Sequence, residues 1–198
     1  MKRLFDIVAS LIGLIIVSPF FILIAIAIVI ESKGGVFYKQ VRVGKNNLDF
    51  KLFKFRTMRP NSEKLGLLTV GGRDPRVTIV GYYLRKYKLD ELPQLLNVIL
   101  GDMSLVGPRP EVRKYVDLYN QEQKKVLMVK PGITDYASIL YSKENELLAT
   151  AENPEALYIN EIMPHKLKLN MQYINNPGII TDLKIIFKTI IKIAGINL

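Results

Sequence analysis

Residues 7–30 read IVASLIGLIIVSPFFILIAIAIVI, and this stretch without a charged residue decides which kind of fold the chain can adopt. At about 1.5 Å of helical rise per residue, it is long enough for the roughly 30 Å hydrocarbon core of a bilayer. A cleaved signal peptide is disfavoured, because the apolar part before the polar Glu31-Ser32-Lys33 is too long. The sequence therefore predicts a membrane anchor over residues 1–33.

Ser18 and Pro19 lie near the middle of this stretch. Pro19 lacks an amide hydrogen and its ring crowds the carbonyl of Ile15, so the helix is expected to kink there. The Ser18 hydroxyl can donate to the carbonyl of Leu14 and help to satisfy the opened backbone. Each arm then reaches only about half of the hydrocarbon thickness. Because basic residues flank both ends, the pattern favours two cytoplasmic ends, and we predict a re-entrant helix, with a kinked spanning helix as the alternative.

The charge balance of the chain indicates an anionic partner. Its 198 residues include 28 Lys and Arg against 18 Asp and Glu, a formal net charge of +10. Such an excess is typical of proteins that meet nucleic acid, an anionic membrane face or phosphorylated small molecules. A hydrophobic content of 49% fits a membrane-contacting protein better than a soluble nucleic-acid binder. There is no Cys and His165 is the only histidine, which excludes disulfides, thiolate metal sites and His-clustered zinc sites.

The middle of the chain reads as short strands followed by helices. Alternating residues on both sides of a turn at 44–47 predict a strand hairpin. A helix is expected from Asp90 to about Leu100, ended by Gly101, because glycine is a good residue to follow the last helical turn. A second, polar-faced helix is expected over 111–129.

The end of the chain, residues 179–198, has the clearest amphipathic pattern. Its apolar stripe consists of Ile179, Leu183, Ile186, Phe187, Ile190 and Ile193. Lysines recur on another face, which suits a helix at the membrane interface; the alternative is an ordinary surface helix packed on a core. The predicted fold class is α/β but mostly helical: a membrane-anchored monotopic protein with an N-terminal re-entrant helix over 1–33. A cytosolic or interfacial catalytic domain follows over 34–198, with short strands and interfacial amphipathic helices.

Asp90 and Glu91 stand side by side where a basic segment ends and an apolar helix begins. The structural interpretation is helix capping, with Asp90 as the N-cap and with Glu91 and Pro93 in the first turn. Acidic groups there oppose the helix dipole, and a proline loses no intrahelical bond. The functional interpretation is a carboxylate pair at the centre of a site. Neighbours at i and i+1 do not share a helix face, so we expect the two to have different roles.

Cationic residues in stiff or neighbouring segments are candidate phosphate ligands. Arg109 lies between two prolines, so its backbone is restricted on both sides. That stiffness lowers the entropy lost when its guanidinium clamps a phosphate. Arg85 shortly precedes the carboxylate pair, and Lys54 and Arg56 add positive charge near the anchor. Each one alone is typical of a solvated surface charge, but together with the pair they describe a site for a phosphorylated substrate, with a carboxylate or a metal at its centre.

The chain resembles the bacterial sugar transferase family in five motifs that occur in the same order: SPF in the anchor, KFRTM, LDELPQLLNV, GDMSLVGPRP and KPGIT. These are the monotopic phosphoglycosyl transferases, which begin glycan assembly on polyprenol phosphate. The resemblance extends from Lys2 to Thr134, with a weaker echo in DLKIIFKTI near the C-terminus.

This resemblance implies a two-step transfer. Asp90 would attack the β-phosphate of a UDP-sugar, release UMP and hold the phosphosugar covalently, and polyprenol (undecaprenyl) phosphate would then accept it. It also implies Mg²⁺ ligated by Asp90, a supporting role for Glu91, and phosphate binding by Arg85 and Arg109. The implied partners are a UDP-sugar, polyprenol phosphate and the lipid bilayer, with a homodimer as a further candidate and no nucleic acid.

The resemblance also implies a topology. A Ser-Pro break such as Ser18-Pro19 gives a re-entrant helix, which places the protein on the cytosolic face of the inner (cytoplasmic) membrane. After KPGIT the chain continues Asp135-Tyr136-Ala137-Ser138, where the family often has Gly-Leu-Ala-Gln. Residues 141–176 are not a close match either, and sugar recognition is expected to involve this region.

Two alternatives from other functional classes remain at this point. A membrane-anchored basic binding module without catalysis would use Asp90 only as a cap, so Asp90→Asn would lower stability by about 1 kcal/mol and leave binding intact. A single-pass nucleic-acid binder is the third interpretation. It is disfavoured by the lack of aromatic-basic RNA motifs and by the apolar C-terminal stripe.

Overall fold

The structure is a computed structural model that describes residues 1–60, 62 and 74–196. Its strands are β1 (Phe37–Val43), β2 (Asp49–Phe55), β3 (Ser104–Val106) and β4 (Gly132–Thr134). Its α-helices are α1 (Lys2–Glu31), α2 (Ile79–Lys86), α3 (Gln94–Leu100), α4 (Arg113–Val116), α5 (Tyr136–Leu140), α6 (Glu144–Ala149), α7 (Pro154–Leu157), α8 (Met163–Asn175) and α9 (Ile179–Ile193). Three 3₁₀ segments, η1 (Lys45–Asn47), η3 (Leu89–Glu91) and η4 (Gln123–Met128), and the π-helix η5 (Tyr158–Ile162) complete the set. The described chain is thus mostly helical with few short strands, as predicted.

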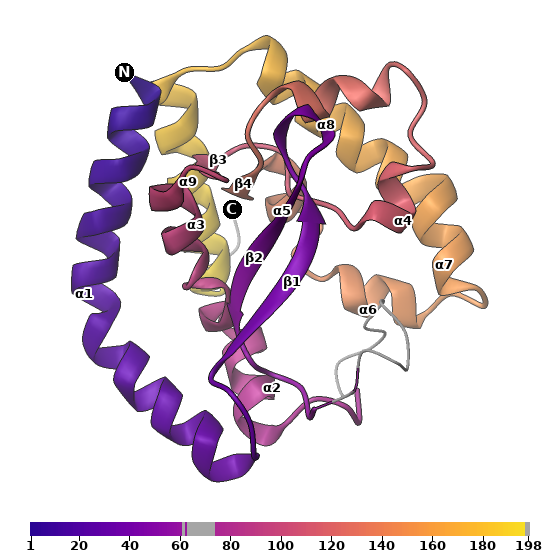
Figure 1. Ribbon diagram of the computed structural model, residues 1–198. Helices are drawn as coiled ribbons and strands as arrows, with labels where there is room; N and C mark the ends of the chain where they lie inside the picture. The colour runs from indigo at the N-terminus through magenta and orange to yellow at the C-terminus, as the bar shows by residue number, and fades with distance from the viewer. Residues whose placement is uncertain (61, 63–73, 197–198) are drawn as a thin grey trace.

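The apolar N-terminal segment forms one continuous helix, α1, with Pro19 inside it. The Ser18 hydroxyl donates to the carbonyl of Ile15 at 2.8 Å, not to that of Leu14 as expected. Ile15 is the residue whose carbonyl would bond the missing Pro19 amide, so the hydroxyl replaces the lost partner. Figure 1 shows that the helix changes direction about halfway along its length.

Most of α1 is not covered by the rest of the described protein. The helix runs along one side of the molecule (Figure 1), and only Asp6, Ser10 and Ile28 of its residues are buried. Its most apolar window has a mean hydropathy of 3.0, and only 6% of that window is buried. A helix of this length and composition can enter a membrane, and its exposed apolar surface is what such an environment would cover.

Both ends of α1 are fastened to the domain by charged side chains. Near the start, the Arg3 guanidinium donates to two carbonyls in the last turn of α3, at 2.5 and 3.0 Å. At the far end, the Glu31 carboxylate accepts the first two amides of α2, at 2.5 and 2.8 Å. Each charge has the sign that the helix end it meets favours. The anchor is therefore held in a defined position relative to α2 and α3.

A buried polar cluster, here called the Lys2 cluster, joins α1 to β3, α8 and α9. It consists of Lys2, Asp6, Ser104, Tyr173 and Asp182. The Lys2 ammonium lies 2.5 Å from one carboxylate oxygen of Asp182, and the Tyr173 hydroxyl donates to the other oxygen at 2.7 Å. The Asp6 carboxylate accepts the Ser104 hydroxyl at 2.8 Å and the next backbone amide at 3.3 Å. Every carboxylate oxygen in the cluster has a partner.

The two small sheets place the loops of the site. β1 and β2 form the predicted antiparallel hairpin around the turn at 44–47, which contains η1. β3 and β4 pair in parallel, so the segments that follow them leave from the same edge. Gly107 and Gly132 lie at this pairing, and a Cβ on Gly132 would sit 2.1 Å from the Gly107 amide nitrogen. Only glycine permits so close an approach of two backbones.

The helix predicted over 111–129 is wrong. The structure has two shorter elements, α4 and η4, separated by a turn. Asn120 and Gln123 exchange side chain–backbone hydrogen bonds at 2.9 Å in both directions. These local bonds replace helical ones in the turn and begin η4, because such polar side chains compete with the helix for backbone partners.

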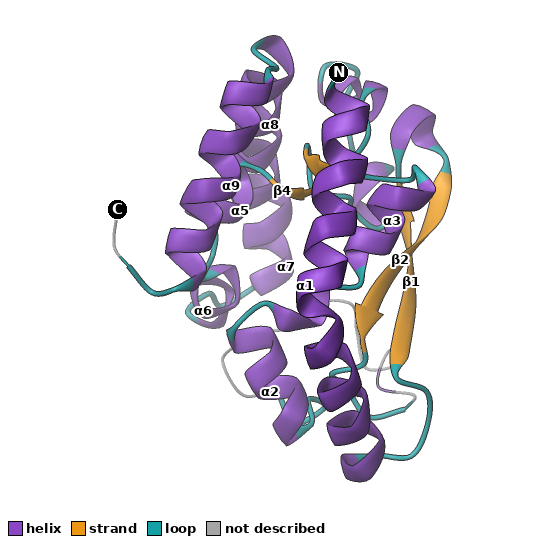
Figure 2. Ribbon diagram, turned by 90° about the vertical axis from the view of Figure 1, so that its left-hand side faces the viewer, coloured by secondary structure: helices purple, strands orange, loops and turns teal. Residues whose placement is uncertain are grey.

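The C-terminal helix α9 turns its predicted apolar stripe away from the core. Asp182 and Ile185 are fully buried, whereas Phe187 is 64% exposed and Ile190 is 60% exposed. The helix thus packs on the domain mainly through a different face, and the described residues leave the stripe largely uncovered, except for Ile186, which packs against the core. Figure 2 shows α9 on the same side of the molecule as α1. The predicted range 179–198 exceeds the helix, and its last two residues lie outside the described part.

Candidate active site

Asp90 does not cap a helix, contrary to the capping interpretation. Lys88 adopts a left-handed backbone conformation (φ 56°) and starts the 3₁₀ turn η3, which contains Asp90. The α3 helix begins only at Gln94, with Pro93 at its N-cap position and no side-chain cap. A positive φ at a residue other than glycine costs about 1–2 kcal/mol. It lets the chain turn the Asp90 side chain inward, where the residue is only 6% exposed.

The buried face of the segment from η3 through α3 is polar at its N-terminal end. Asp90, Pro93, Gln94, Asn97 and Val98 are all buried, at the spacing of a single helix face. The Asn97 side chain accepts the amide of residue 53 at 2.9 Å and donates to the carbonyl of residue 51 at 2.8 Å, which attaches α3 to β2. The Gln94 side-chain nitrogen has no hydrogen-bond partner among the described residues.

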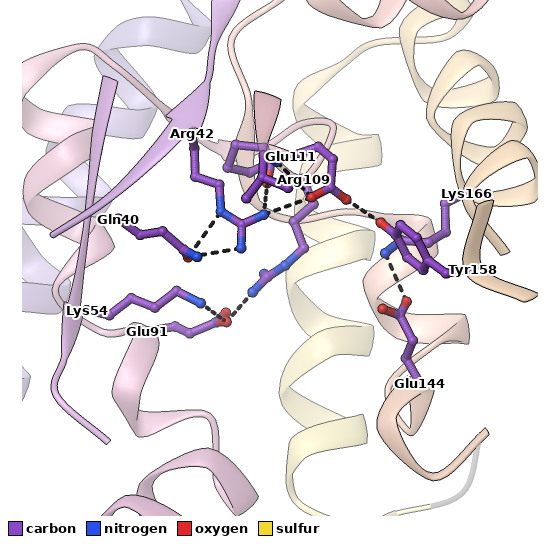
Figure 3. Close-up of polar contacts among 11 residues, drawn as sticks. Gln40, Arg42, Lys54, Glu91, Arg109, Glu111, Glu144, Tyr158 and Lys166 are labelled. Atoms are coloured by element: carbon purple, nitrogen blue, oxygen red, sulfur yellow. Dashed lines mark hydrogen bonds and ion pairs between the residues drawn. The ribbon is translucent and has the colours of Figure 1, made fainter. Parts of the chain in front are cut away.

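Glu91 is the centre of an ion cluster. Its carboxylate oxygen Oε1 lies 3.2 Å from the Lys54 ammonium of β2 and also accepts a hydrogen bond from the Arg109 guanidinium. Figure 3 shows the three side chains converging from β2, η3 and the loop after β3. Their side chains are 13–30% exposed, so the cluster is partly shielded from water. The structure therefore brings Lys54 and Arg109 into contact with Glu91 of the carboxylate pair.

Arg109 is held at the edge where β3 and β4 end. Its backbone amide donates to the Asp135 carboxylate at 3.1 Å, and its guanidinium also donates to the Ile133 carbonyl at 3.3 Å. The other oxygen of Asp135 accepts the Ser138 amide at 2.6 Å and caps α5. Asp135, the residue at which the chain departs from the family pattern after KPGIT, thus holds the backbone of Arg109. Sequence reasoning noticed this departure but not its role.

Asp90 differs from its neighbour in its electrostatic state. Among the described residues, nothing donates a hydrogen bond to its carboxylate or forms an ion pair with it. Burial, followed by the adjacent Glu91 charge, raises its pKa, and Lys54, Arg85 and Lys88 only partly oppose this. Desolvation and a like charge both disfavour the ionised form. The site therefore contains a carboxylate without a counter-ion in contact, which binding of a cation or an electrophile would relieve.

Glu91 is ionised and its pKa is depressed. Burial alone would raise its pKa, but the charges of Arg109 and Lys54 outweigh burial and hold it well below its usual value. In the same way, burial would lower the pKa of Arg109, yet Glu91 raises it. Burial lowers the pKa of Lys54 despite the attraction of Glu91. The two adjacent carboxylates thus have opposite shifts, which matches the expectation of different roles.

The two remaining arginines are placed differently. Arg85 donates to the Thr57 hydroxyl at 2.9 Å, and burial lowers its pKa while nearby carboxylates, Asp90 first among them, oppose this. Arg56 instead donates to the carbonyls of Lys33 and Ser32, at 2.6 and 2.7 Å. The structure thus gives Arg56 a role at the end of the anchor, and its predicted phosphate binding has no support from these contacts.

Sequence reasoning missed two residues of the site, Gln94 and Asp135, and the backbone conformation of a third, Lys88. Gln94 carried a signal, because a buried amide four residues after Asp90 on an apolar helix is unusual. Lys88 carried none, since nothing in its side chain indicates a left-handed backbone. Asp135 could have been found as a capping residue before a short helix.

The donor set fits a magnesium ion shared with a substrate. Within the described ranges, no three His, Cys, Asp or Glu side chains gather to form a metal site. Proteins that bind Mg²⁺ with phosphorylated substrates commonly supply one or two carboxylates, and the phosphates supply the rest. The unpaired Asp90 carboxylate fits that arrangement, whereas Glu91 is already engaged by two cations.

Taken together, the geometry defines a class of protein. The charges of Lys54, Arg85, Lys88 and Arg109 act on the two carboxylates, and cations of this kind bind phosphates. The site belongs to a domain that carries an exposed apolar helix. The protein therefore combines an exposed apolar helix, of a length and composition that could enter a membrane, with a site suited to phosphate esters.

The chain belongs to the bacterial sugar transferase family, whose sequence model matches residues 1–195. It is 40% identical over 192 residues to the UDP-N-acetylgalactosamine-undecaprenyl-phosphate N-acetylgalactosaminephosphotransferase of Aeromonas hydrophila, covering 96% of this chain and 42% of the relative. It is 35% identical to the UDP-glucose:undecaprenyl-phosphate glucose-1-phosphate transferase of Escherichia coli, covering 97% of this chain and 40% of the relative. The chain thus spans about two fifths of these two relatives.

Shorter relatives match over most of their length. The exopolysaccharide production protein ExoY of Sinorhizobium fredii is 35% identical, with 96% of this chain and 83% of the relative covered. The sugar transferase EpsL of Bacillus subtilis is 39% identical, with 98% and 87% covered. The region shared by all four relatives therefore includes the anchor and the candidate site.

Proposed function

We propose that this protein transfers a sugar 1-phosphate from a UDP-sugar to polyprenol phosphate, through a covalent intermediate on Asp90, as the first membrane step of glycan assembly. The observation that carries the proposal is the contrast within the carboxylate pair. Asp90 is buried and has no described partner, while the adjacent Glu91 is ion-paired. The names of the relatives from A. hydrophila and E. coli, which specify a UDP-sugar and undecaprenyl phosphate, support the substrate classes.

The proposed transfer consists of two displacements at the same phosphorus atom. An oxygen of the Asp90 carboxylate forms a bond to the β-phosphorus, the bond from that phosphorus to the bridging oxygen breaks, and UMP leaves with the electron pair. An oxygen of polyprenol phosphate then attacks the same phosphorus, and the Asp90 carboxylate is released. Splitting the transfer in this way replaces one reaction between two anions by two steps.

The neighbouring side chains have distinct tasks in this scheme. Arg109 and Arg85 bind the phosphate oxygens and offset their charge, because a guanidinium matches phosphate in shape and sign. Glu91 is ionised because its pKa is depressed. Its carboxylate holds Arg109 and Lys54 in place through ion pairs. When bound, Mg²⁺ on Asp90 would supply further neutralisation of phosphate charge.

The proposed reaction is tested by intact-protein mass spectrometry. Incubated with a panel of UDP-sugars and no lipid acceptor, the wild-type protein should gain the mass of one phosphosugar and release UMP. Asp90→Asn should gain none, and Asp117→Asn, on an exposed surface position, serves as the matched control. Release of UDP, or an adduct that persists in Asp90→Asn, would refute the mechanism. The sugar that gives the fastest adduct identifies the donor.

We also propose that α1 is re-entrant, so both of its ends lie on the cytosolic face of the inner membrane. Because the chain has no cysteine, single-cysteine variants report one position each. Leu4→Cys and Lys33→Cys should both react with an impermeant thiol reagent added to inside-out vesicles. Ile15→Cys, at a position exposed in the structure, should be protected by lipid. Labelling of positions 4 and 33 from opposite sides would show a spanning helix instead.

A further inference from the structure

A second cluster of polar side chains lies beside the site and contacts the loop that carries Arg109. It consists of Arg42, Glu111 and Tyr158 and is here called the Glu111 clamp. The Glu111 carboxylate accepts from Arg42 at 3.0 Å through one oxygen and from the Tyr158 hydroxyl through the other. Figure 3 shows the clamp next to Arg109, with Gln40 on the far side of Arg42. The function proposed above assigns these residues no role.

The clamp fixes the chain just after Arg109. The Arg42 guanidinium also donates to the Pro110 carbonyl at 3.2 Å, and the Val43 amide donates to the Glu111 carbonyl at 2.9 Å. The prolines on both sides of Arg109 allow little rotation about their own φ angles. A shift at residues 110–111 would therefore be transmitted to Arg109 and not absorbed between them.

Tyr158 reaches Glu111 from an unusual backbone. It begins the π-helix η5, and π-helical turns are rare and occur frequently at functional sites. The Tyr158 residue is 3% exposed, and burial followed by the Glu111 charge raises its pKa, so its hydroxyl stays a donor. The Lys166 ammonium lies 5.3 Å from the centre of the Tyr158 ring and pairs with Glu144 at 2.9 Å.

We propose that Tyr158 and Glu111 are positioning residues that set the place of the Arg109 guanidinium, so the segment from α6 to α8 takes part in binding the donor phosphates. The proposal rests on the function proposed above for its kinetic consequence. A purely structural clamp would stabilise the core equally whether or not Arg109 is present. A positioning clamp acts through Arg109, so its effect on turnover must depend on that side chain.

A double-mutant cycle separates these cases. Tyr158→Phe removes only the hydroxyl and should lower kcat/KM for the UDP-sugar by about tenfold. In an Arg109→Lys background, the same change should lower it by less than about twofold, since the group being positioned is already altered. Equal losses in both backgrounds would overturn the proposal.

Tyr115→Phe is the matched control for that experiment. Tyr115 is buried in the same core, with its ring 4.9 Å from that of Tyr158. Among the described residues, its hydroxyl has no hydrogen-bond partner. This variant should keep kcat/KM within about twofold of wild type. A loss as large as that of Tyr158→Phe would show a general packing effect and would count against positioning.

A spectroscopic measurement tests the positioning without relying on catalysis. In protein labelled with ¹⁵N-arginine, the Nε–Hε resonance of Arg109 is assigned by its disappearance in Arg109→Lys. Tyr158→Phe should move this resonance, and Tyr115→Phe should leave it in place. If wild-type protein releases no UMP but the resonance moves, the proposed function fails and the positioning stands. An unmoved resonance overturns the positioning even if the enzyme is active.

Discussion

The Lys2 cluster and the candidate active site are two solutions to burying a pair of carboxylates. In the Lys2 cluster, Asp6 and Asp182 are almost fully buried, and each of their four oxygens has a hydrogen-bond or ion-pair partner. In the active site, Glu91 is paired but Asp90 has no partner among the described residues. One lysine accompanies the two carboxylates of the first cluster, whereas the charges of four cations, Lys54, Arg85, Lys88 and Arg109, act on those of the second.

This difference in hydrogen-bond and ion-pair partners distinguishes a cluster that only stabilises the fold from a site that binds a substrate. A buried polar group without a partner costs about 1–3 kcal/mol, and more when it is charged. A cluster that only connects elements has no reason to retain that cost, and the Lys2 cluster does not. The active site retains an unpaired carboxylate among several cations, a combination that becomes favourable when a phosphorylated substrate binds. The following changes test this contrast in order of expected effect.

Asp90→Asn should have the largest effect on activity and almost none on stability. Removing the proposed nucleophile should lower adduct formation by more than about 10³-fold. Removing a buried, unpaired charge should leave the unfolding temperature in detergent unchanged or higher. Thermal unfolding beside the mass-spectrometric assay checks both. A large fall in stability would show that Asp90 is held by contacts, and the contrast with the Lys2 cluster would disappear.

Glu91→Gln should damage both properties. It leaves the Lys54 and Arg109 charges partly buried without a carboxylate, which we expect to lower the free energy of unfolding by about 2–3 kcal/mol after allowance for their exposure. Adduct formation should fall as well, because Arg109 loses its ionic partner. Chemical denaturation in micelles measures the first effect. Glu155→Gln, which also removes a carboxylate from an ion pair but on an exposed surface, should change stability by less than about 0.5 kcal/mol.

Asp182→Asn should affect stability alone. The amide can still accept from Tyr173 but loses the ion pair with Lys2, whose side chain is 38% exposed. We therefore expect a loss of about 1–2 kcal/mol in the free energy of unfolding. Adduct formation per folded molecule should stay within about threefold of wild type, because the cluster and the site share no partner. A loss of activity at full stability would mean that the cluster serves the reaction directly.

The sequence predicted most of what depends on local pattern. The apolar anchor, the hairpin around 44–47 and the glycine that ends α3 follow from hydrophobic periodicity and turn chemistry. The grouping of Lys54, Arg56, Arg85 and Arg109 with the carboxylate pair was also predicted, from stiff or nearby segments and from family motifs. The structure places Lys54 and Arg109 in contact with Glu91 but Arg56 at the end of α1, and the proposed roles of the residues remain predictions.

What the sequence could not give depends on long-range contacts. The helix expected over 111–129 has the right composition, but Asn120 forms local bonds that end it. Arg56 is as basic as Arg85, yet only the fold decides that it meets the end of α1. The capping interpretation of Asp90 failed because Lys88 has a positive φ and starts a 3₁₀ turn, so that α3 begins only at Gln94.

Gln94→Met should give the smallest effect and the most direct test of the contrast. Gln94 shares the inward face of α3 with Asp90, is 1% exposed, and has a side-chain nitrogen without a partner among the described residues. Methionine has a similar length and no amide to desolvate, so stability should rise by up to about 1 kcal/mol. For a protein of this size, that is an increase of about 2–4 °C in unfolding temperature.

Asn97→Met is the opposite control, because the Asn97 side chain is hydrogen-bonded through both its oxygen and its nitrogen and its loss should destabilise the protein. If Gln94→Met lowers the unfolding temperature instead, the amide is satisfied in the resting protein. The unpaired state would then be confined to Asp90, and the site would be less strained than its contrast with the Lys2 cluster suggests.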